Sequence, residues 1–210
     1  MADKKPSCRL CDIGSYVSGR EPIPETLLRW LSDEETREAA LVIDPAERAR
    51  RLVAKAVLKG KLGSILDVEP SSLLFERTPH GKPFLALARF CWLRFNLSHS
   101  GTFVAVSLGR TELGIDIERH RPLGDVNALM DQYFCRDEHQ FFLKRDGESH
   151  LEKFFSLWTR KEAILKAMGT GFSRSPESVS AAGSEIIEGC WRVHSIIAPP
   201  GYSAAVAWQI

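Results

Sequence analysis

The sequence has 210 residues, a length that suits one large domain or two small lobes of about 100 residues each. Hydrophobic residues make up 44% and charged residues 26%, so neither a disordered nor a fibrous protein is indicated. With 28 Lys and Arg against 27 Asp and Glu, the net charge of +1 provides no general attraction to nucleic acid or to anionic membranes. Any charged partner must therefore be recognised by a local cluster of side chains.

The N-terminal residues contain no continuous apolar core of the signal-peptide type, and nowhere do about 18 apolar residues follow one another. The five cysteines are scattered, which favours free thiols in a reducing compartment over a disulfide framework. We therefore expect a cytoplasmic protein. Cys8 and Cys11 form a CxxC pair without a second Cys or His pair nearby, so we assign them no zinc site and expect an exposed N-terminal segment.

Two helices are predicted in the first third of the chain. Ser32 and Glu35 have the spacing of a capping box, which predicts a short helix after Ser32. An acid and a proline at residues 44–45 begin a longer helix, which is predicted to end at Gly63.

Short apolar runs interrupted by turn residues follow between residues 73 and 108, which predicts strands joined by tight turns. The clearest strand covers residues 102–109, and another is expected at residues 112–119.

The second half of the chain again places helices before strands. A helix is expected from Asp125 to a break near residue 136, and a long amphipathic helix from residue 151 to Gly169. Strands are predicted at residues 191–197 and 203–209.

The two halves resemble each other weakly. The segment FVAVSLG, at residues 103–109, is loosely like YSAAVAWQI, at residues 202–210. Together with the repeated order of elements, this likeness indicates two similar α+β lobes that meet near residue 110.

Two acids share one face of the strand predicted at residues 112–119. Asp116 and Glu118 alternate with apolar residues, so both carboxylates project from the same face, roughly 7 Å apart. Paired oxygen ligands at this spacing suit a hard divalent cation such as Mg²⁺. A half-buried strand with a hydrated acidic face is the alternative interpretation, and the spacing alone does not decide between them.

Glu162 interrupts an apolar stripe of the long helix. It lies at helical spacing from Phe155 and Trp158, and Lys166 follows one turn later. Because burial of an unpaired carboxylate is costly, a cation or a hydrogen-bond network is expected around Glu162. The alternative is a surface Glu–Lys pair of small energetic value.

Cations follow one face of the helix that begins after residue 44. Arg48, Arg51, Lys55 and Lys59 are separated by three or four residues. A solvated face is the common explanation, but such a stripe also suits a polyphosphate as counter-charge. Lys82 lies in a predicted turn, from which its amine is expected to reach outward and add one more cation.

The segment NLSHSG, at residues 96–101, brings amide, hydroxyl and imidazole groups together between two predicted strands, as suits phosphate or carbonyl binding. A Ser–His hydrolase is improbable, because Ser98 and His99 are neighbours on a strand and no GxSxG segment is present.

The segments FNLSHSG, GIDIE and FSLWTRKEAILK, in this order, resemble the three signature blocks of the 4′-phosphopantetheinyl transferases, specifically the larger, pseudo-dimeric Sfp type. The motifs cover about residues 44–172, and the length suits this branch better than the short trimeric holo-acyl-carrier synthases. The resemblance implies an α+β fold of two similar lobes, each with a small antiparallel sheet packed on helices. Residues 1–110 would contact the coenzyme A phosphates, and residues 111–210 would carry the Mg²⁺-binding acids and the catalytic helix.

The resemblance also implies roles for individual residues. Asp116, Glu118 and Glu162 would bind Mg²⁺, Glu162 would also be the base for the carrier serine, and Lys166 would contact the transferred phosphate. The phosphates of coenzyme A would be held by Arg51, Lys55, Lys82, Ser98, His99 and Lys166, with His99 on the 3′-phosphate.

Two positions depart from the family pattern. Lys55 stands where the family commonly has arginine, which keeps the charge but removes the bidentate contact. Glu138 follows Phe134 much as a further acid does in members of the family. The local sequence YFCRDE differs from the family pattern, which puts a metal role for Glu138 in doubt.

The implied reaction is attack of a serine hydroxyl of an apo acyl or peptidyl carrier protein on the β-phosphate of coenzyme A, with release of adenosine 3′,5′-bisphosphate. Mg²⁺ would be the cofactor, coenzyme A the co-substrate, and the protein a monomer without nucleic-acid or membrane partners. Two alternatives stay open: a catalytically silent module that binds coenzyme A or a carrier, and a Mg²⁺-dependent phosphodiesterase or nuclease. The complete set of acids argues against the first, and the lack of basic net charge against the second. No segment indicates which carrier is served.

Overall fold

The computed structural model describes residues 5–144, 147, 149–170, 174–183, 187 and 190–210, so residues 171 and 172 at the end of the motif range lie outside it. The strands are β1 Ser7–Asp12, β2 Phe75–Arg77, β3 Pro83–Leu85, β4 Arg94–Ser100, β5 Phe103–Gly109, β6 Leu113–Arg119, β7 Trp191–Ser195 and β8 Tyr202–Gln209. The helices are α1 Gly14–Val17, α2 Glu25–Leu28, α3 Asp33–Ala40, α4 Pro45–Leu66, α5 Val126–Tyr133, α6 Arg136–Lys144 and α7 His150–Met168. Short 3₁₀ turns cover Pro70–Ser72, Ala88–Phe90 and Pro176–Ser178.

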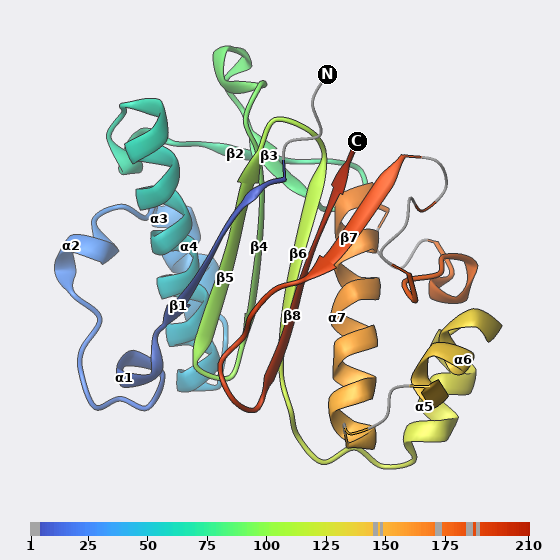
Figure 1. Ribbon diagram of the computed structural model, residues 1–210. Helices are drawn as coiled ribbons and strands as arrows, with labels where there is room; N and C mark the ends of the chain where they lie inside the picture. Colours follow the sequence, from blue (N-terminus) through green and yellow to red (C-terminus); the bar gives the residue numbers. More distant parts are fainter. Residues whose placement is uncertain (1–4, 145–146, 148, 171–173, 184–186, 188–189) are drawn as a thin grey trace.

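Two small antiparallel sheets repeat one plan. Their strand orders are β1-β5-β4 and β6-β8-β7, and β2 and β3 form a separate hairpin. Along the chain, each lobe has one strand, then a long helix, then two further strands of the same sheet. The last of these strands lies in the middle of the sheet. Figure 1 shows α4 beside the first sheet and α7 beside the second. The predicted α+β fold of two similar lobes is confirmed, and the likened segments are the two central strands, β5 and β8.

Residues 7–12 of the N-terminal segment, which was expected to be exposed, form the edge strand β1, in which three residues are exposed and three are half-buried. β1 pairs with β5 over its whole length, from Ser7 opposite Leu108 to Asp12 opposite Phe103. Residues three apart on a strand point to opposite faces, so the thiols of Cys8 and Cys11 do not converge on one site.

The local signals for α3 are confirmed, but the end of α4 was predicted too early. Ser32 and Glu35 form the predicted capping box at the start of α3. α4 continues past Gly63 and ends at Leu66, with Asp67 in the left-handed conformation after it. Gly63 is needed inside the helix, because a Cβ there would be too close to the carbonyl oxygen of Val68.

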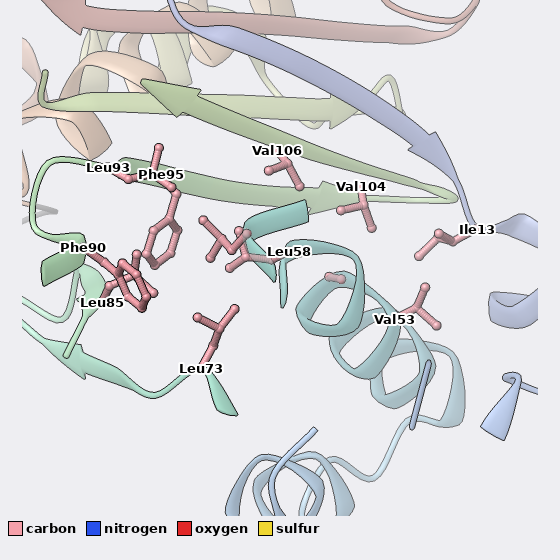
Figure 2. Close-up of a cluster of buried hydrophobic side chains, with 12 residues drawn as sticks. Ile13, Val53, Leu58, Leu73, Leu85, Phe90, Leu93, Phe95, Val104 and Val106 are labelled. Carbon is pink, nitrogen blue, oxygen red and sulfur yellow. The ribbon is translucent and has the colours of Figure 1, made fainter. Parts of the chain in front are cut away.

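The core of the first lobe lies between α4 and its sheet. Figure 2 shows Val53 and Leu58 of α4 directed toward Phe95 of β4 and Val104 of β5, all of which are buried. Alternating residues of these strands therefore face α4, which leaves the intervening residues of β4 free to face the second lobe.

α7 packs closely on β6 and β8, and its predicted bounds are confirmed to within one residue at its start. Gly114 of β6 lies against the backbone of the helix, where a Cβ would overlap the carbonyl oxygen of Ala163. α5 and α6 cover another side of α7 through an aromatic cluster that includes Phe134, Phe154 and Trp158. In the described part of the chain, no helix combines the length and the apolarity needed to cross a membrane.

Candidate active site

The candidate site lies where β4 of one sheet meets β6 of the other. The strands are joined by side chains: the Ser98 hydroxyl donates to Oδ1 of Asp116 at 2.8 Å, and the Ser100 hydroxyl donates to Oε2 of Glu118 at 2.8 Å. The residue numbers of these hydrogen-bonded partners increase in the same direction on both strands, so β4 and β6 run parallel here. Each serine therefore holds one carboxylate of the predicted acidic pair.

Asp116 is the most buried of the three acids expected to bind metal, at 2% exposed. Its Oδ1 accepts from the ammonium of Lys166 at 2.6 Å, and this ammonium also donates to the hydroxyl of Ser98 at 3.1 Å. Its Oδ2 is buried and has no hydrogen-bond partner among the described residues. An unsatisfied buried carboxylate oxygen is costly, so Oδ2 marks a position where a cation or donor group would fit.

Glu118 and Glu162 complete a group of mutually repelling acids. Burial raises the pKa of Glu162 to about 7, and the charges of Asp116 and Glu118 add to this effect while Lys166 opposes it. Burial also raises the pKa of Glu118, and Asp116 contributes to the increase. The three predicted acids therefore share one electrostatic environment, although they come from β6 and α7.

The donor set of this site suits a hard cation. As they lie, no three His, Cys, Asp or Glu side chains of the described residues are grouped tightly enough to hold a metal ion. The ammonium of Lys166 lies on Asp116 instead. The available ligands are carboxylate oxygens, which Mg²⁺ prefers, and Oδ2 of Asp116 lacks a partner. The residues therefore fit Mg²⁺, provided that their side chains adjust.

A cavity of about 360 Å³ opens on the other side of β4, between α3, α4 and the β2–β3 hairpin. Its titratable lining residues are Glu35, Glu38, Arg51, Lys55, Arg77 and His99. The volume lies within the range of small-molecule sites, and the lining has three cations and two carboxylates. The structure thus brings Arg51, Lys55 and His99, three of the six residues expected to bind phosphate, to one cavity.

His99 points into this cavity as a mostly uncharged imidazole. Burial lowers its pKa, as do the neighbouring cations Arg50, Lys166 and Arg51, whereas Glu47 has the opposite effect. Near neutral pH its ring can therefore donate one hydrogen bond and accept another.

The four cations spaced along α4 do not form one solvated face, which was one of the two interpretations of their spacing. Lys59 is fully buried and donates to Oε2 of Glu35 at 2.9 Å, and Arg48 donates to the carbonyl oxygen of Val42 at 2.8 Å. Only Arg51 and Lys55 of the four line the cavity. The carboxylate of Glu35, which is largely shielded from solvent and also caps α3, accepts a cation from the facing helix.

The amine of Lys82 does not reach outward as predicted. It donates to Oε2 of Glu112 at 2.7 Å and to the carbonyl oxygen of Ala167 at 2.9 Å. Carbonyl groups in the last turn of a helix lack partners within the helix, so Lys82 satisfies one at the end of α7. It lines a separate, smaller cavity of about 180 Å³, together with Glu112 and Arg94.

Glu138 is occupied by structural contacts. It is fully buried, and Oε2 accepts from the ammonium of Lys161 at 2.7 Å and from the backbone N–H of Cys135 at 2.9 Å. Oε1 accepts from the backbone N–H of Ala181 at 2.9 Å. These contacts join α6, α7 and the segment after α7, and they leave Glu138 no evident capacity for a metal.

Sequence reasoning missed three residues of the site. Asn96 accepts from the backbone N–H of Ile115 at 2.9 Å, and Ser100 binds Glu118, so alternate residues of the NLSHSG segment join the lobes. The alternation of side chains along a strand could have predicted this, because it places Asn96, Ser98 and Ser100 on the face opposite to that of His99. Arg77 of β2 also lines the cavity, and no pattern in the sequence distinguished it.

Two family models match the chain in succession. Residues 23–110 match the model described as 4′-phosphopantetheinyl transferase, N-terminal, and residues 112–204 match that of the 4′-phosphopantetheinyl transferase superfamily. The chain belongs to this superfamily, and the resemblance of its three signature segments is confirmed.

Individual relatives carry the same family name. The chain is 35% identical to the 4′-phosphopantetheinyl transferase HetI of Nostoc sp. over 156 residues, which cover 73% of this chain but only 65% of that relative. It is 31% identical to the 4′-phosphopantetheinyl transferase psf-1 of Bacillus pumilus over 189 residues, which cover 89% of this chain and 79% of the relative. Identity to the 4′-phosphopantetheinyl transferase Sfp of Bacillus subtilis is 24% over 156 residues, 74% of this chain and 68% of the relative.

Proposed function

We propose that the protein is an enzyme that transfers the 4′-phosphopantetheine group of coenzyme A to a serine of an apo acyl or peptidyl carrier protein, in a Mg²⁺-dependent reaction. The observation that supports this most is the arrangement around β4. A group of three acids, of which Asp116 is buried and the others half-buried, lies with one lysine on one side of the strand, and a cavity lined by Arg51, Lys55 and Arg77 lies on the other. Phosphoryl transfer requires positioning and charge neutralisation, and this arrangement is suited to both.

The two halves would divide the task. Residues 1–110 would hold the coenzyme A phosphates, and residues 111–210 would carry the reaction centre. The proposed phosphate ligands are Arg51, Lys55, Lys82, Ser98 and His99 of the first half, together with Lys166 of the second. For Lys82 this role would require release from Glu112, to which it is now bound.

In the proposed reaction the serine oxygen forms a bond to the β-phosphorus, and the bond between that phosphorus and the bridging oxygen breaks. Adenosine 3′,5′-bisphosphate leaves. Glu162, with a pKa raised by burial to about 7, would accept the serine proton at a carboxylate oxygen, and Lys166 would contact the transferred phosphate. Mg²⁺ bound by Asp116, Glu118 and Glu162 would supply positive charge to the diphosphate.

A mass-gain assay tests this proposal. Purified protein is incubated with coenzyme A, MgCl₂ and several apo acyl and peptidyl carriers, and the intact mass of each carrier is measured. We expect a gain of one phosphopantetheine group on at least one carrier and none on a carrier whose acceptor serine is replaced by alanine. If the protein is folded and no carrier gains mass, the proposal is refuted. In that case, coenzyme A binding measured by calorimetry would identify a module that binds coenzyme A without turnover.

A further inference from the structure

The turn between β4 and β5 is approached closely by the second lobe. Gly101, in this turn, has a φ of +55°, a left-handed conformation that favours glycine. A Cβ at Gly101 would overlap the hydroxyl oxygen of Tyr202, on β8, and would crowd the side chain of Arg119, on β6. The lack of a side chain at Gly101 therefore leaves room for two strands of the other lobe to contact the turn directly.

The hydroxyl of Tyr202 forms two hydrogen bonds with this turn. It accepts from the backbone N–H of Thr102 at 3.0 Å, and it lies 3.2 Å from the hydroxyl of Thr102, to which it can donate. The ring of Tyr202 also packs edge-on against Phe103, with 5.0 Å between the ring centres. Because Tyr202 is the first residue of β8 and pairs with Arg119 of β6, these contacts join the turn to the strand that carries two of the acids.

The same turn is also bound to its own lobe. Arg50 of α4 donates through Nε to the carbonyl oxygen of Gly101 at 2.9 Å, and only 17% of its side chain is exposed. The backbone N–H of Ile13 donates to the carbonyl oxygen of Thr102 at 2.8 Å. The first lobe thus fixes the turn through two carbonyl groups, and Tyr202 of the second lobe fixes it through an N–H group.

Ser100 connects this turn to the acids of the candidate site. It is the last residue of β4, two residues before Thr102, and its hydroxyl donates to Oε2 of Glu118 at 2.8 Å. Among the described residues, Ser100 is the one hydrogen-bond donor to this carboxylate. Because a single residue separates Ser100 from Thr102, the anchoring of Thr102 by Tyr202 limits how far the Ser100 hydroxyl can move. The orientation of Glu118 therefore depends on the contact that Tyr202 makes.

We propose that Tyr202 is a positioning residue: its hydroxyl fixes the β4–β5 turn and, through Ser100, holds the carboxylate of Glu118 where it can bind Mg²⁺. The inference rests on the proposed function for the role of Glu118. Tyr202 itself contacts neither substrate in this account. The last strand of the chain thereby helps to assemble the site between the lobes.

A double-mutant cycle of metal binding tests this role. Mn²⁺ prefers the same oxygen ligands as Mg²⁺, and its free form is measured by electron paramagnetic resonance. It is titrated into the wild type, Tyr202→Phe, Ser100→Ala and the double variant. Tyr202→Phe keeps the ring beside Phe103 and removes only the hydroxyl. We expect its dissociation constant to rise about three- to fivefold, less than the rise of about tenfold expected for Ser100→Ala, because Tyr202 acts one contact further from the metal.

In the Ser100→Ala background, Tyr202→Phe should change the dissociation constant little, because the contact that transmits the effect is already lost. Equal effects in both backgrounds would overturn the inference. The matched control is Tyr133→Phe. Tyr133 is another half-buried tyrosine of the second lobe, whose ring packs against Trp158 and whose hydroxyl has no hydrogen-bond partner among the described residues. This control should bind Mn²⁺ as the wild type does.

Amide hydrogen exchange, measured by NMR without metal or coenzyme A, separates this inference from the proposed function. The N–H of Thr102 donates to Tyr202 and that of Arg119 donates to Ser100, each at 3.0 Å. In Tyr202→Phe both amides should exchange about three- to tenfold faster, because the first loses its acceptor and the second loses a fixed position of its acceptor. Amides in the middle of α4 should exchange as in the wild type.

Faster exchange at both amides, in a protein that binds no Mn²⁺ and transfers no phosphopantetheine, would refute the proposed function and the metal role of Glu118. It would still support the positioning of Glu118 by Tyr202. Exchange at Arg119 that is unchanged in folded Tyr202→Phe would overturn the inference, whether or not the protein is an active transferase.

Discussion

The ammonium of Lys166, on α7, lies 2.6 Å from Oδ1 of Asp116, on β6. Burial lowers the pKa of Lys166, but the charge of Asp116 more than offsets this, so the pKa is raised and the lysine stays charged. One acid of the site is thereby neutralised. Burial raises the pKa of Glu118 and Glu162, and repulsion by Asp116 adds to the effect, because neither acid has a cation as close as Lys166 is to Asp116.

Removal of this lysine should destabilise the fold as well as stop transfer. In Lys166→Met the buried carboxylate of Asp116 loses its charged partner, which should lower the free energy of unfolding by about 1–3 kcal/mol. Urea unfolding measures the loss. The double variant Asp116→Asn/Lys166→Met is the matched control, because it removes both charges and should recover part of the stability. Equal losses in the single and double variants would contradict the coupling.

Glu162 should make stability depend on pH in a defined direction. Its pKa is near 4.5 when unfolded and about 7 when folded, so the folded protein binds more protons between these values. The stability associated with the protonated form is fully present below pH 4.5 and is lost as the pH rises through 7. Glu162→Gln keeps the neutral shape and should avoid this loss.

In EDTA, Glu162→Gln should therefore be more stable than the wild type at pH 8, by about 1–3 kcal/mol, and nearly equal at pH 5. Denaturant unfolding at both pH values checks this. The substituted protein should also fail to transfer phosphopantetheine at either pH. A stability difference that is the same at pH 5 and pH 8 would contradict a raised pKa.

Ser100 should position the carboxylate of Glu118. Its hydroxyl donates to Glu118 and accepts from the backbone N–H of Arg119 at 3.0 Å, so it fixes the end of β6 against β4. In Ser100→Ala we expect the Mg²⁺ concentration for half-maximal transfer to rise about tenfold, as on loss of a group that orients a metal ligand. Ser71→Ala, at an exposed position in a 3₁₀ turn, should leave it unchanged. If Mg²⁺ dependence is unaltered while kcat falls, Ser100 acts on the substrate instead.

Local patterns in the sequence predicted the parts of the fold that are determined by neighbours in the chain. The capping box at Ser32 and the period of two in β6 each depend on residues within one short segment. The same period correctly placed Asp116 and Glu118 on one face. Helical spacing placed Glu162 and Lys166 on one side of α7, and in the structure this side meets the two acids.

Pairings between distant segments could not be predicted in this way. β1 has a weak strand pattern and is stabilised by β5, about a hundred residues later in the chain. Lys59 and Lys82 both look like surface cations, but each satisfies a group on another element, Glu35 in one case and Glu112 in the other. The spacing of cations in a sequence therefore does not reveal which of them are already paired with an acid of the same protein.

Glu138 should prove to be a structural acid and not a metal ligand. Its carboxylate is fully buried, and each of its oxygens has a protein donor, including the buried ammonium of Lys161. Glu138→Ala would leave that ammonium without its counter-charge, so the free energy of unfolding should fall by about 3 kcal/mol. The Mg²⁺ concentration for half-maximal transfer, measured at a temperature where the variant is still folded, should equal that of the wild type. An increase in that concentration, with stability preserved, would restore the metal role that relatives suggest. Asp116→Asn in the same assay provides the positive control, because it alters a proposed ligand directly.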